Sequence, residues 1–405
     1  MSLHTDTSEA SITTIEAPRQ ERTLPSHRIL HVVEATFAGV GRHVLDLAGA
    51  QANAGHEVHV AYSPLRMSNS FRQEMESLEN VRWFACEMQR SIGLHDYPSV
   101  QQLRKHFDQI HPDVLHGHSA KGGALARLAS YGKRCLTLYT PNGIYSMNPN
   151  LRPRARFLND FIERRLASWT DAVIAVSGEE AEHIAENIGI TKQKTHVVNN
   201  GISPIRKHDK ADVRNEHRLP HDKYIVGFVG RLDDQKSPQD LVRVYAAIAE
   251  QEPNAHFVVV GTGSLNDEVQ TLSRSFPALD GRIHWLGEQP GVRAMAAFDL
   301  FLLPSAYEGF PYVLLEATSS GLPIVTTHGA CARDIVSHGE SGFICDHGDI
   351  AALSDAALEL IRDPHAQASF SQAALEKGKP FSVTRMASEV EDILLGLSVT
   401  PRSAQ

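Results

Sequence analysis

The sequence has few of the features that mark secreted or membrane-spanning proteins. Its four cysteines lie far apart among 405 residues and form no CxxC pair, so we expect reduced thiols and a cytoplasmic protein. It contains no run of about 18 apolar residues, which a membrane-spanning helix would need. Residues 1–25 are rich in Ser, Thr and Glu and lack the apolar core of a secretion signal. Their composition predicts a disordered N-terminal tail.

Positive charge and metal-binding spacings are also scarce. Lys and Arg number 39 against 48 Asp and Glu, so the formal net charge is −9. An acidic chain of this kind is a poor partner for nucleic acid. None of the 22 histidines stands in an HExxH or zinc-finger spacing, and the sequence therefore predicts no metal. Binding of a phosphate group must then depend on a few local cations.

What the sequence does contain is an alternation of short β-branched runs and helical patterns. The run at 29–33, a helical pattern from about Arg42 to Gly55 and the run at 58–62 form a β-α-β unit. A polar stretch at about 204–222 separates two series of such units. The expected strands are 29–33, 58–62, 114–118, 135–139, 172–176 and 196–198 in the first series, and 225–229, 256–260, 283–286, 300–303, 323–326 and 342–345 in the second.

Two series of this kind predict an α/β protein with two Rossmann-like domains, each a doubly wound parallel sheet, that face each other across a cleft. We expect a first domain over 26–205, a second over 206–383, and a C-terminal segment over 384–405. Ligands of such sheets bind at the carboxyl ends of the strands, so the cleft is the expected site.

The strongest local signal lies at 227–238. A strand ends there, and Arg231 and Lys236 follow it in a loop. Ser237 suits the N-cap of the next helix and Pro238 its first position. Two cations just before a helix N-terminus predict a diphosphate clamp. The alternative is a solvated surface loop.

A second signal follows the expected strand 300–303. Glu308 falls in a loop, and Glu316 falls in the helix after it. The loop amides of Gly309 and Phe310 would point into the cleft. Carboxylates accept hydrogen bonds from hydroxyls, so this segment predicts a site for a sugar or a ribose. The alternative is that both carboxylates are ordinary helix and surface charges.

Two glycine pairs follow expected strands. Gly39 and Gly41 come after the first strand, and Gly261 and Gly263 come after the strand 256–260. These residues allow close approach of the backbone to a ligand. Both pairs lack the third glycine of the dinucleotide motif, so nicotinamide binding is not indicated.

One strand ends in histidine. His116 and His118 share a face at the end of the strand 114–118. A histidine at such a place in a cleft can bond a hydroxyl or stabilise charge. The alternative is a core histidine whose nitrogens are satisfied within the protein.

A basic stretch at 152–165 stands out in this acidic chain. It is amphipathic and could contact anionic lipid head groups or an acidic acceptor, with a solvated helix as the alternative. Its arginines are Arg152, Arg154, Arg156, Arg164 and Arg165.

Taken in order, these segments resemble the retaining GT-B glycosyltransferases of family 4 (group 1 type), which use nucleotide-sugar donors. The resemblance runs from about residue 29 to about residue 388 and includes Glu308 and Glu316 in an E-x7-E arrangement. Asn142 stands where the family often has His, and Asp334 stands where it has Glu. The other matching segments are 39–41, 118, 140–143, 176–177, 199–202, 230–236 and 261–263.

The resemblance implies roles for the candidate residues. Arg231 and Lys236 would neutralise the donor diphosphate. Glu316 would bond the ribose hydroxyls, and Glu308 would hold the transferred sugar. The implied catalytic residues are His118, Arg231, Lys236 and Glu308; the implied ligand-binding residues are Gly39, Gly41, Gly261, Gly263, Gly309, Phe310 and Glu316.

The resemblance also implies a function. It is the retaining transfer of a sugar from a nucleotide-diphosphate sugar to an acceptor hydroxyl, in surface polysaccharide or glycolipid synthesis, with no metal or other cofactor required. The first domain would face the acceptor, the second would hold the donor, and the C-terminal helix would cross back to the first. Partners would be the donor, a sugar or lipid-linked acceptor, and an anionic membrane at its inner face. A GT-B sugar-nucleotide epimerase or phosphorylase, and a nucleotide-sugar-binding protein without catalysis, stay open as alternatives.

Overall fold

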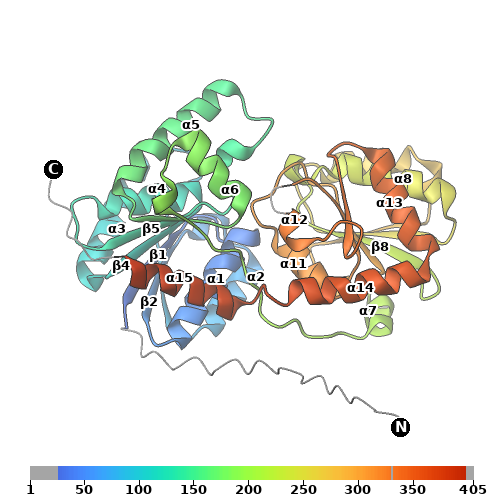
Figure 1. Ribbon diagram of the computed structural model, residues 1–405, viewed down its shortest axis with the longest axis horizontal. Coiled ribbons are helices and arrows are strands. Elements are labelled where there is room, and N and C mark those ends of the chain that lie inside the picture. The colour runs from blue at the N-terminus through green and yellow to red at the C-terminus, as the bar shows by residue number, and fades with distance from the viewer. Residues whose placement is uncertain (1–25, 330–331, 398–405) are drawn as a thin grey trace, which may run out of the picture.

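The computed structural model describes residues 26–329 and 332–397. Within these residues the chain forms two α/β domains that lie side by side (Figure 1). The tail expected at 1–25, Cys331 and the last residues of the C-terminal segment lie outside the described part. In the described part, no helix is long and apolar enough to cross a membrane.

The first domain is built on a parallel sheet of seven strands in the order β3-β2-β1-β4-β5-β6-β7. In Figure 1, α3, α4 and α5 lie next to one another on one side of this sheet, and α1, α2 and α15 lie on the other. The strands are β1 (Arg28–Val33), β2 (Glu57–Tyr62), β3 (Val81–Ala85), β4 (Val114–His118), β5 (Leu136–Thr140), β6 (Ala172–Ala175) and β7 (Thr195–Val197). The helices are α1 (Ala38–Asn53), α2 (Asn69–Ser77), α3 (Asp96–Ile110), α4 (Ser119–Ser130), α5 (Pro153–Leu166) and α6 (Gly178–His183).

The second domain has a parallel sheet of six strands in the order β10-β9-β8-β11-β12-β13. The strands are β8 (Tyr224–Val229), β9 (Ala255–Val260), β10 (Ile283–Gly287), β11 (Leu300–Leu303), β12 (Ile324–Thr327) and β13 (Gly342–Cys345). The helices are α7 (Lys210–Glu216), α8 (Pro238–Gln251), α9 (Asn266–Arg274), α10 (Gly291–Met295), α11 (Tyr312–Ser319), α12 (Ala332–Ile335), α13 (Ile350–Arg362), α14 (Pro364–Gly378) and α15 (Val383–Gly396), the last of which packs on the first domain.

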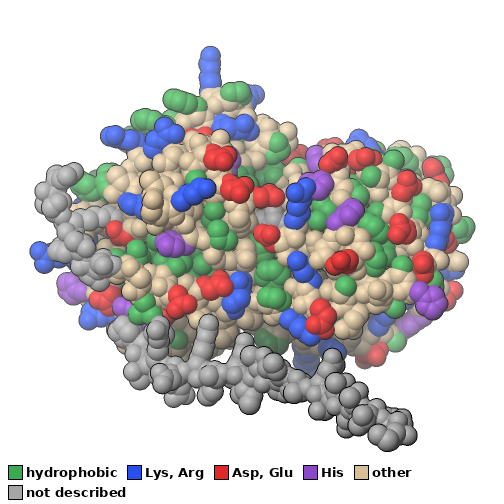
Figure 2. Space-filling view, in the orientation of Figure 1, with side chains coloured by type: hydrophobic (Ala, Val, Ile, Leu, Met, Phe, Trp, Pro, Cys, Tyr) green, Lys and Arg blue, Asp and Glu red, His purple; other side chains and the backbone are tan. Residues whose placement is uncertain are grey.

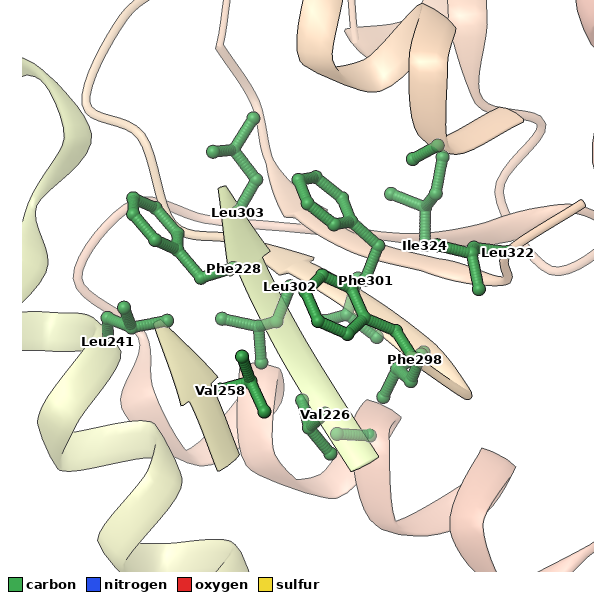
Figure 3. Close-up of a cluster of buried hydrophobic side chains, with 14 of the residues drawn as sticks. Val226, Phe228, Leu241, Val258, Phe298, Phe301, Leu302, Leu303, Leu322 and Ile324 are labelled. Carbon is green, nitrogen blue, oxygen red and sulfur yellow. The ribbon is translucent and has the colours of Figure 1, made fainter. Parts of the chain in front are cut away.

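The core of the second domain lies on both faces of its sheet. Figure 3 shows Phe228, Val258 and Phe301 from β8, β9 and β11 in one cluster with Leu241 of the covering helix α8. All three are inaccessible to solvent. Because helices cover both faces, the strands are continuous apolar runs, and this is the pattern from which the parallel sheet was predicted. At Gly227 a Cβ would lie 2.1 Å from the Phe298 ring, so glycine allows that ring to pack on the strand.

The predicted fold class is confirmed, and two local predictions are wrong. Strand β3 was not expected because it is an edge strand in which only Val81 is buried, so its sequence lacks a clear apolar run. Helix α1 begins at Ala38 and not at about Arg42. Gly39 and Gly41 therefore lie in the first turn of a helix, where their low helix propensity hides the start of the helix in the sequence.

The chain crosses between the domains along two adjacent segments. Residues 199–202 lead into the second domain, and residues 381–383 lead back, with an isolated parallel bridge between Ile202 and Ser382. A Cβ on Gly201 would lie 2.1 Å from the Ser382 carbonyl oxygen, so only glycine allows the two segments to run this close. Helix α15 then packs Met386 and Val390 against the core of the first domain.

Candidate functional site

Loops that follow the carboxyl ends of strands in the two sheets touch across the domain boundary, together with the first crossing segment. Asn142 and Gly143 follow β5 and have positive φ angles of 56° and 96°. A Cβ on Gly309, in the loop after β11, would lie only 2.8 Å from the Cα of Gly143. Within the same contact region, Asn200 of the first crossing donates to the Phe310 carbonyl at 3.0 Å. The two domains are therefore closed on each other around the loop 308–311.

A buried carboxylate on α6 holds the loop that follows β5 through backbone hydrogen bonds. Glu180 of α6 is inaccessible to solvent and accepts backbone N–H bonds from Gly143 and Ile144, each at 2.8 Å, and from Val176 at 2.8 Å. The two bonds from Gly143 and Ile144 fix the turn at 142–144 in the place where it meets Gly309, and the bond from Val176 anchors the carboxylate to the end of β6.

The two predicted cations lie at the end of β8 in different surroundings. Lys236 is mostly buried, and its Nζ contacts Oε1 of Glu308 at 2.5 Å. Arg231 is exposed, pairs with Asp233 at 2.9 Å and lies 5.7 Å from the centre of the Phe37 ring of the first domain. The structure thus joins Lys236 and Glu308 in one ion pair and leaves Arg231 at the rim.

The start of α8 differs in detail from the prediction. Pro238 is the first helical residue and Ser237 occupies the N-cap position, as expected, but Ser237 has a left-handed backbone (φ 47°). Its hydroxyl bonds His347 Nε2 at 2.8 Å and does not cap the helix. The first-turn amides of α8 therefore have no side-chain cap among the described residues. Uncapped N–H groups of this kind are suited to bind an anion.

Glu316 lies in α11 near charged groups of the first domain. The carboxyl group is partly buried, and loss of water raises its pKa to about 7. The Arg42 guanidinium of α1 opposes that rise, and the carboxylates of Asp46 and Glu74 add to it. Burial also raises the pKa of Asp46 to about 6, although Asp46 accepts a hydrogen bond from Arg42 at 2.6 Å. At neutral pH Glu316 is divided between its protonated and ionised forms.

His118 belongs to a network of buried histidines. Its Nε2 lies 2.9 Å from Nδ1 of His31, whose Nε2 bonds Gln51 at 2.8 Å. Burial holds the pKa of His118 well below its usual range, so the ring is neutral. Its Nδ1 has no partner among the described residues. His118 is therefore a core histidine, and its Nδ1 is buried as well as unpartnered among the described residues.

A second chain of hydrogen bonds links the histidines to the loop 308–311. His43 of α1 bonds Asn200 through Nδ1 at 2.9 Å, and Asn200 in turn donates to Phe310. The rings of His43 and His118 lie 5.3 Å apart. This chain connects the first domain, the crossing segment and the loop of Glu308.

Sequence reasoning assigned no role to His31, His43 or Asn200. A signal was present at His31, because a histidine interrupts an otherwise apolar run at 29–33. No pattern in the sequence pairs His43 with Asn200, which lie 157 positions apart.

The four glycines fall into two groups. Gly39 faces Tyr312 of the second domain, with 3.6 Å between its Cβ position and the ring, and Gly41 sits above Phe71. A Cβ on Gly261 would lie 2.0 Å from the Gly230 carbonyl oxygen, and one on Gly263 would lie 2.2 Å from the Leu232 carbonyl oxygen. Packing of two loops thus already explains why Gly261 and Gly263 have no side chain.

Among the described residues, one group of three side chains has nitrogens close enough to hold a metal ion. It consists of His31, His116 and His118, whose candidate ligand atoms lie within 4.8 Å of one another. Both nitrogens of His31 and the Nε2 atoms of His116 and His118 are engaged within the protein, since His31 bonds His118 and Gln51, and His116 bonds Thr140 at 2.8 Å.

Two family models match the chain, one for each domain. The model described as Glycosyltransferase Family 4 matches residues 37–206, and the model described as Glycosyl transferases group 1 matches residues 209–377. The chain belongs to the family 4, group 1 glycosyltransferases. The predicted family and the GT-B fold are thereby confirmed.

Curated relatives of this glycosyltransferase cover most of its length. The UDP-Gal:alpha-D-GlcNAc-diphosphoundecaprenol alpha-1,3-galactosyltransferase of Escherichia coli is 25% identical over 333 residues, which are 79% of this chain and 85% of that protein. The N-acetyl-alpha-D-glucosaminyl L-malate synthase of Bacillus anthracis is 26% identical over 370 residues, which are 88% and 94% of the two chains.

Solved structures share the fold of this glycosyltransferase at low sequence identity. Anabaena Alr3699/HepE in complex with UDP has a TM-score of 0.77 and 22% identity, with 91% of this chain and 100% of that chain covered. The lipopolysaccharide glycosyltransferase WaaG has a TM-score of 0.70 and 16% identity, with 91% and 100% covered. At these identities the likeness shows the GT-B fold alone.

Proposed function

We propose that this glycosyltransferase moves a hexosyl group, with retention, from a nucleotide-diphosphate sugar to an acceptor hydroxyl in surface polysaccharide or glycolipid synthesis. The observation that carries the proposal is the Lys236–Glu308 ion pair at the end of β8, with Arg231 beside it. A donor can exchange with both partners of this pair, because its diphosphate attracts the ammonium and its sugar hydroxyls donate to the carboxylate.

The chemical difficulty of the transfer is charge. As the bond from the sugar to the diphosphate breaks, negative charge grows on the diphosphate and the sugar becomes oxocarbenium-like. Lys236, Arg231 and the uncapped amides of α8 supply positive charge for the leaving group. We propose that these groups make a metal unnecessary.

Retention is the finer part of the proposal. We propose that the acceptor hydroxyl attacks from the face that the diphosphate leaves, so that the configuration at the reacting carbon is kept. His118 is neutral because it is buried, so it would add no charge near the oxocarbenium-like centre. The contact between Gly143 and Gly309 would close the site and exclude water.

Uridine-diphosphate sugars are the first donors to test. The name of the Escherichia coli relative includes UDP-Gal, and Alr3699/HepE has been solved in complex with UDP-glucose. Incubation of the enzyme with the donor, first alone and then with candidate acceptors, distinguishes the alternative functions. Sugar transfer that requires an acceptor supports the proposal, whereas epimerised donor, or binding without turnover across many acceptors, favours the other two candidates.

The test of the clamp is Lys236→Ala. Without the ammonium, the leaving diphosphate loses its most buried cation, and we expect turnover to fall by about 10²–10³-fold. Steady-state assays measure this fall. Lys379→Ala, which removes an exposed lysine from the end of α14, is the matched control and should keep full turnover. Near-normal turnover of a folded Lys236→Ala enzyme would overturn the assignment.

A further inference from the structure

Helix α5 carries a row of large apolar side chains that point away from the protein. Phe157, Leu158 and Phe161 keep 75%, 58% and 51% of their surface exposed. They occupy positions i, i+1 and i+4 of one helix and thus share a face. Figure 2 shows hydrophobic and Lys or Arg side chains together over α5, at the top of the first domain.

The opposite face of α5 fixes the orientation of the helix. Glu163 is buried and pairs with the fully buried Arg127 of α4 at 2.8 Å, and the Tyr139 hydroxyl donates to the same carboxylate at 3.2 Å. Leu166 is buried beside them. Rotation of α5 to hide its apolar face would break a buried ion pair, which is costly. The exposed face is therefore a fixed property of the folded domain.

Two arginines extend the apolar row at both ends. Arg154 and Arg165 lie four residues before Leu158 and four residues after Phe161, on the same helical stripe. Their side chains are exposed and form no ion pair with any residue in the described ranges. By contrast, the side chain of Arg164 is used within the fold, since it donates to the Ile188 carbonyl at 2.6 Å.

We propose that this α5 face, which consists of Arg154, Phe157, Leu158, Phe161 and Arg165, docks onto an anionic lipid bilayer. Apolar side chains flanked by arginines match an anionic bilayer, which has negatively charged head groups at its surface and acyl chains beneath them. A second copy of the chain is a poorer occupant, because two such faces brought together around a two-fold axis would place arginines near arginines.

The position of α5 relative to the candidate site gives membrane docking a functional role. The segment that joins β5 to α5 starts at the turn 142–144, which touches the loop of Glu308, and further along it Asn150 lines a pocket together with Ser237 and Ala306. A bilayer held at α5 would thus lie at the end of a short segment that begins in the site. This use of docking rests on the proposed function, because it takes the acceptor to be carried on a lipid.

The test is co-sedimentation of the full chain with vesicles of phosphatidylcholine, alone or with one part in three of phosphatidylglycerol. We expect binding to the anionic vesicles and weak binding to the neutral ones. The variant Arg154→Glu/Arg165→Glu should bind the anionic vesicles at least about 30-fold more weakly, since each arginine near such a surface contributes about a fivefold factor. Phe157→Ser/Phe161→Ser should also lose binding.

The matched control is Arg72→Glu/Arg274→Glu. It changes the net charge by the same amount at exposed arginines of α2 and α9, and it should bind as the unchanged protein does. Equal loss in both arginine pairs, or no binding of the unchanged protein to anionic vesicles, would overturn the proposal. So would a dimer in solution that the phenylalanine variant dissociates, because α5 would then be a protein interface.

A second measurement separates this proposal from the proposed function. Binding of a uridine-diphosphate sugar by calorimetry should be the same in the arginine variant and the unchanged protein. If neither binds the donor while vesicle binding still depends on α5, the donor assignment fails and the docking surface stands.

Discussion

At the scale of single residues, the site is a set of charges that are balanced before any donor arrives. Lys236 and Glu308 are both mostly buried and neutralise each other. Removal of one partner of such a pair leaves a buried charge without compensation, so the enzyme needs both even when it is empty. Glu316 is different, because the nearby Arg42 is shared with Asp46 and Glu74. Burial raises the pKa of Glu316 to about 7, and the Asp46 and Glu74 carboxylates add to the rise that Arg42 opposes.

A pH dependence of donor binding follows from Glu316. Its pKa is raised to about 7, so the carboxylate predominates above pH 7 and the neutral acid predominates below it. If the carboxylate accepts hydrogen bonds from the ribose, affinity for a nucleotide-diphosphate sugar should fall by up to about tenfold between pH 8 and pH 6. Calorimetry measures this fall.

Glu316→Gln is the comparison for that measurement. The amide has the same shape and does not titrate, so the variant should bind more weakly at pH 8 and with less dependence on pH. An affinity of the unchanged enzyme that is constant from pH 8 to pH 6 would contradict the role of Glu316.

At the scale of elements, two loops from different domains decide whether the site is closed. The turn at 142–144 is held by Glu180, and the loop 308–311 is held by Lys236 and Asn200. These loops meet at Gly143 and Gly309, where neither chain has a side chain. Closure therefore depends on glycine at the meeting point and on hydrogen bonds behind it.

Gly309→Ala tests that closure. A Cβ at residue 309 would lie 2.8 Å from the Gly143 Cα, which is shorter than a normal contact, so the loops must move apart. A misplacement of this size can reduce turnover by up to about 100-fold, and we expect a loss of at least about tenfold in kcat. Donor affinity should change much less, because Lys236 and Glu316 stay in place.

Gly178→Ala is the matched control for this substitution. No atom lies within 4 Å of its Cβ position, so the variant should keep its kcat. Equal kcat in Gly309→Ala and the unchanged enzyme would show that the two loops need not meet during turnover.

At the scale of the whole molecule, the first domain carries a group of neutral histidines in its interior. Burial lowers the pKa of His31 and His43 to about 4 and the pKa of His116 and His118 well below its usual range. A histidine whose pKa is lowered by folding stabilises the protein above pH 6.5, and this stability is lost as the pH falls toward 4. The stability of the folded state is thus sensitive to acid because of these buried histidines.

His43→Gln isolates one member of this group. The amide can still bond Asn200 but cannot take up a proton. Between pH 7 and pH 5, the unchanged protein should lose about 2 kcal/mol more of its free energy of unfolding than the variant does. Urea denaturation at both pH values measures the difference, and His221→Gln, at an exposed histidine, is the control. An equal loss in His43→Gln and the unchanged protein would contradict a buried, neutral His43.

Local sequence patterns were sufficient for most of the fold. The apolar runs at 225–229 and 300–303 became β8 and β11 almost without change, because strands covered on both faces need unbroken apolar sequence. The edge strand β3 and the start of α1 escaped prediction, since neither has a strong local pattern. Of the candidate site, Lys236 and Glu308 were predicted as separate charges, and the resemblance placed both at the donor.

The sequence by itself determined the two βα series, the cations at the end of β8 and the carboxylates at 308 and 316. These depend on neighbours within a few residues, where periodicity, capping and residue type are decisive. Only the tertiary structure decided that Lys236 pairs with Glu308, that Gly143 meets Gly309, that His43 reaches Phe310 through Asn200, and that the apolar face of α5 has no partner within the described chain. The physical reason is that burial and choice of partner depend on contacts between residues far apart in the sequence, which local periodicity does not encode.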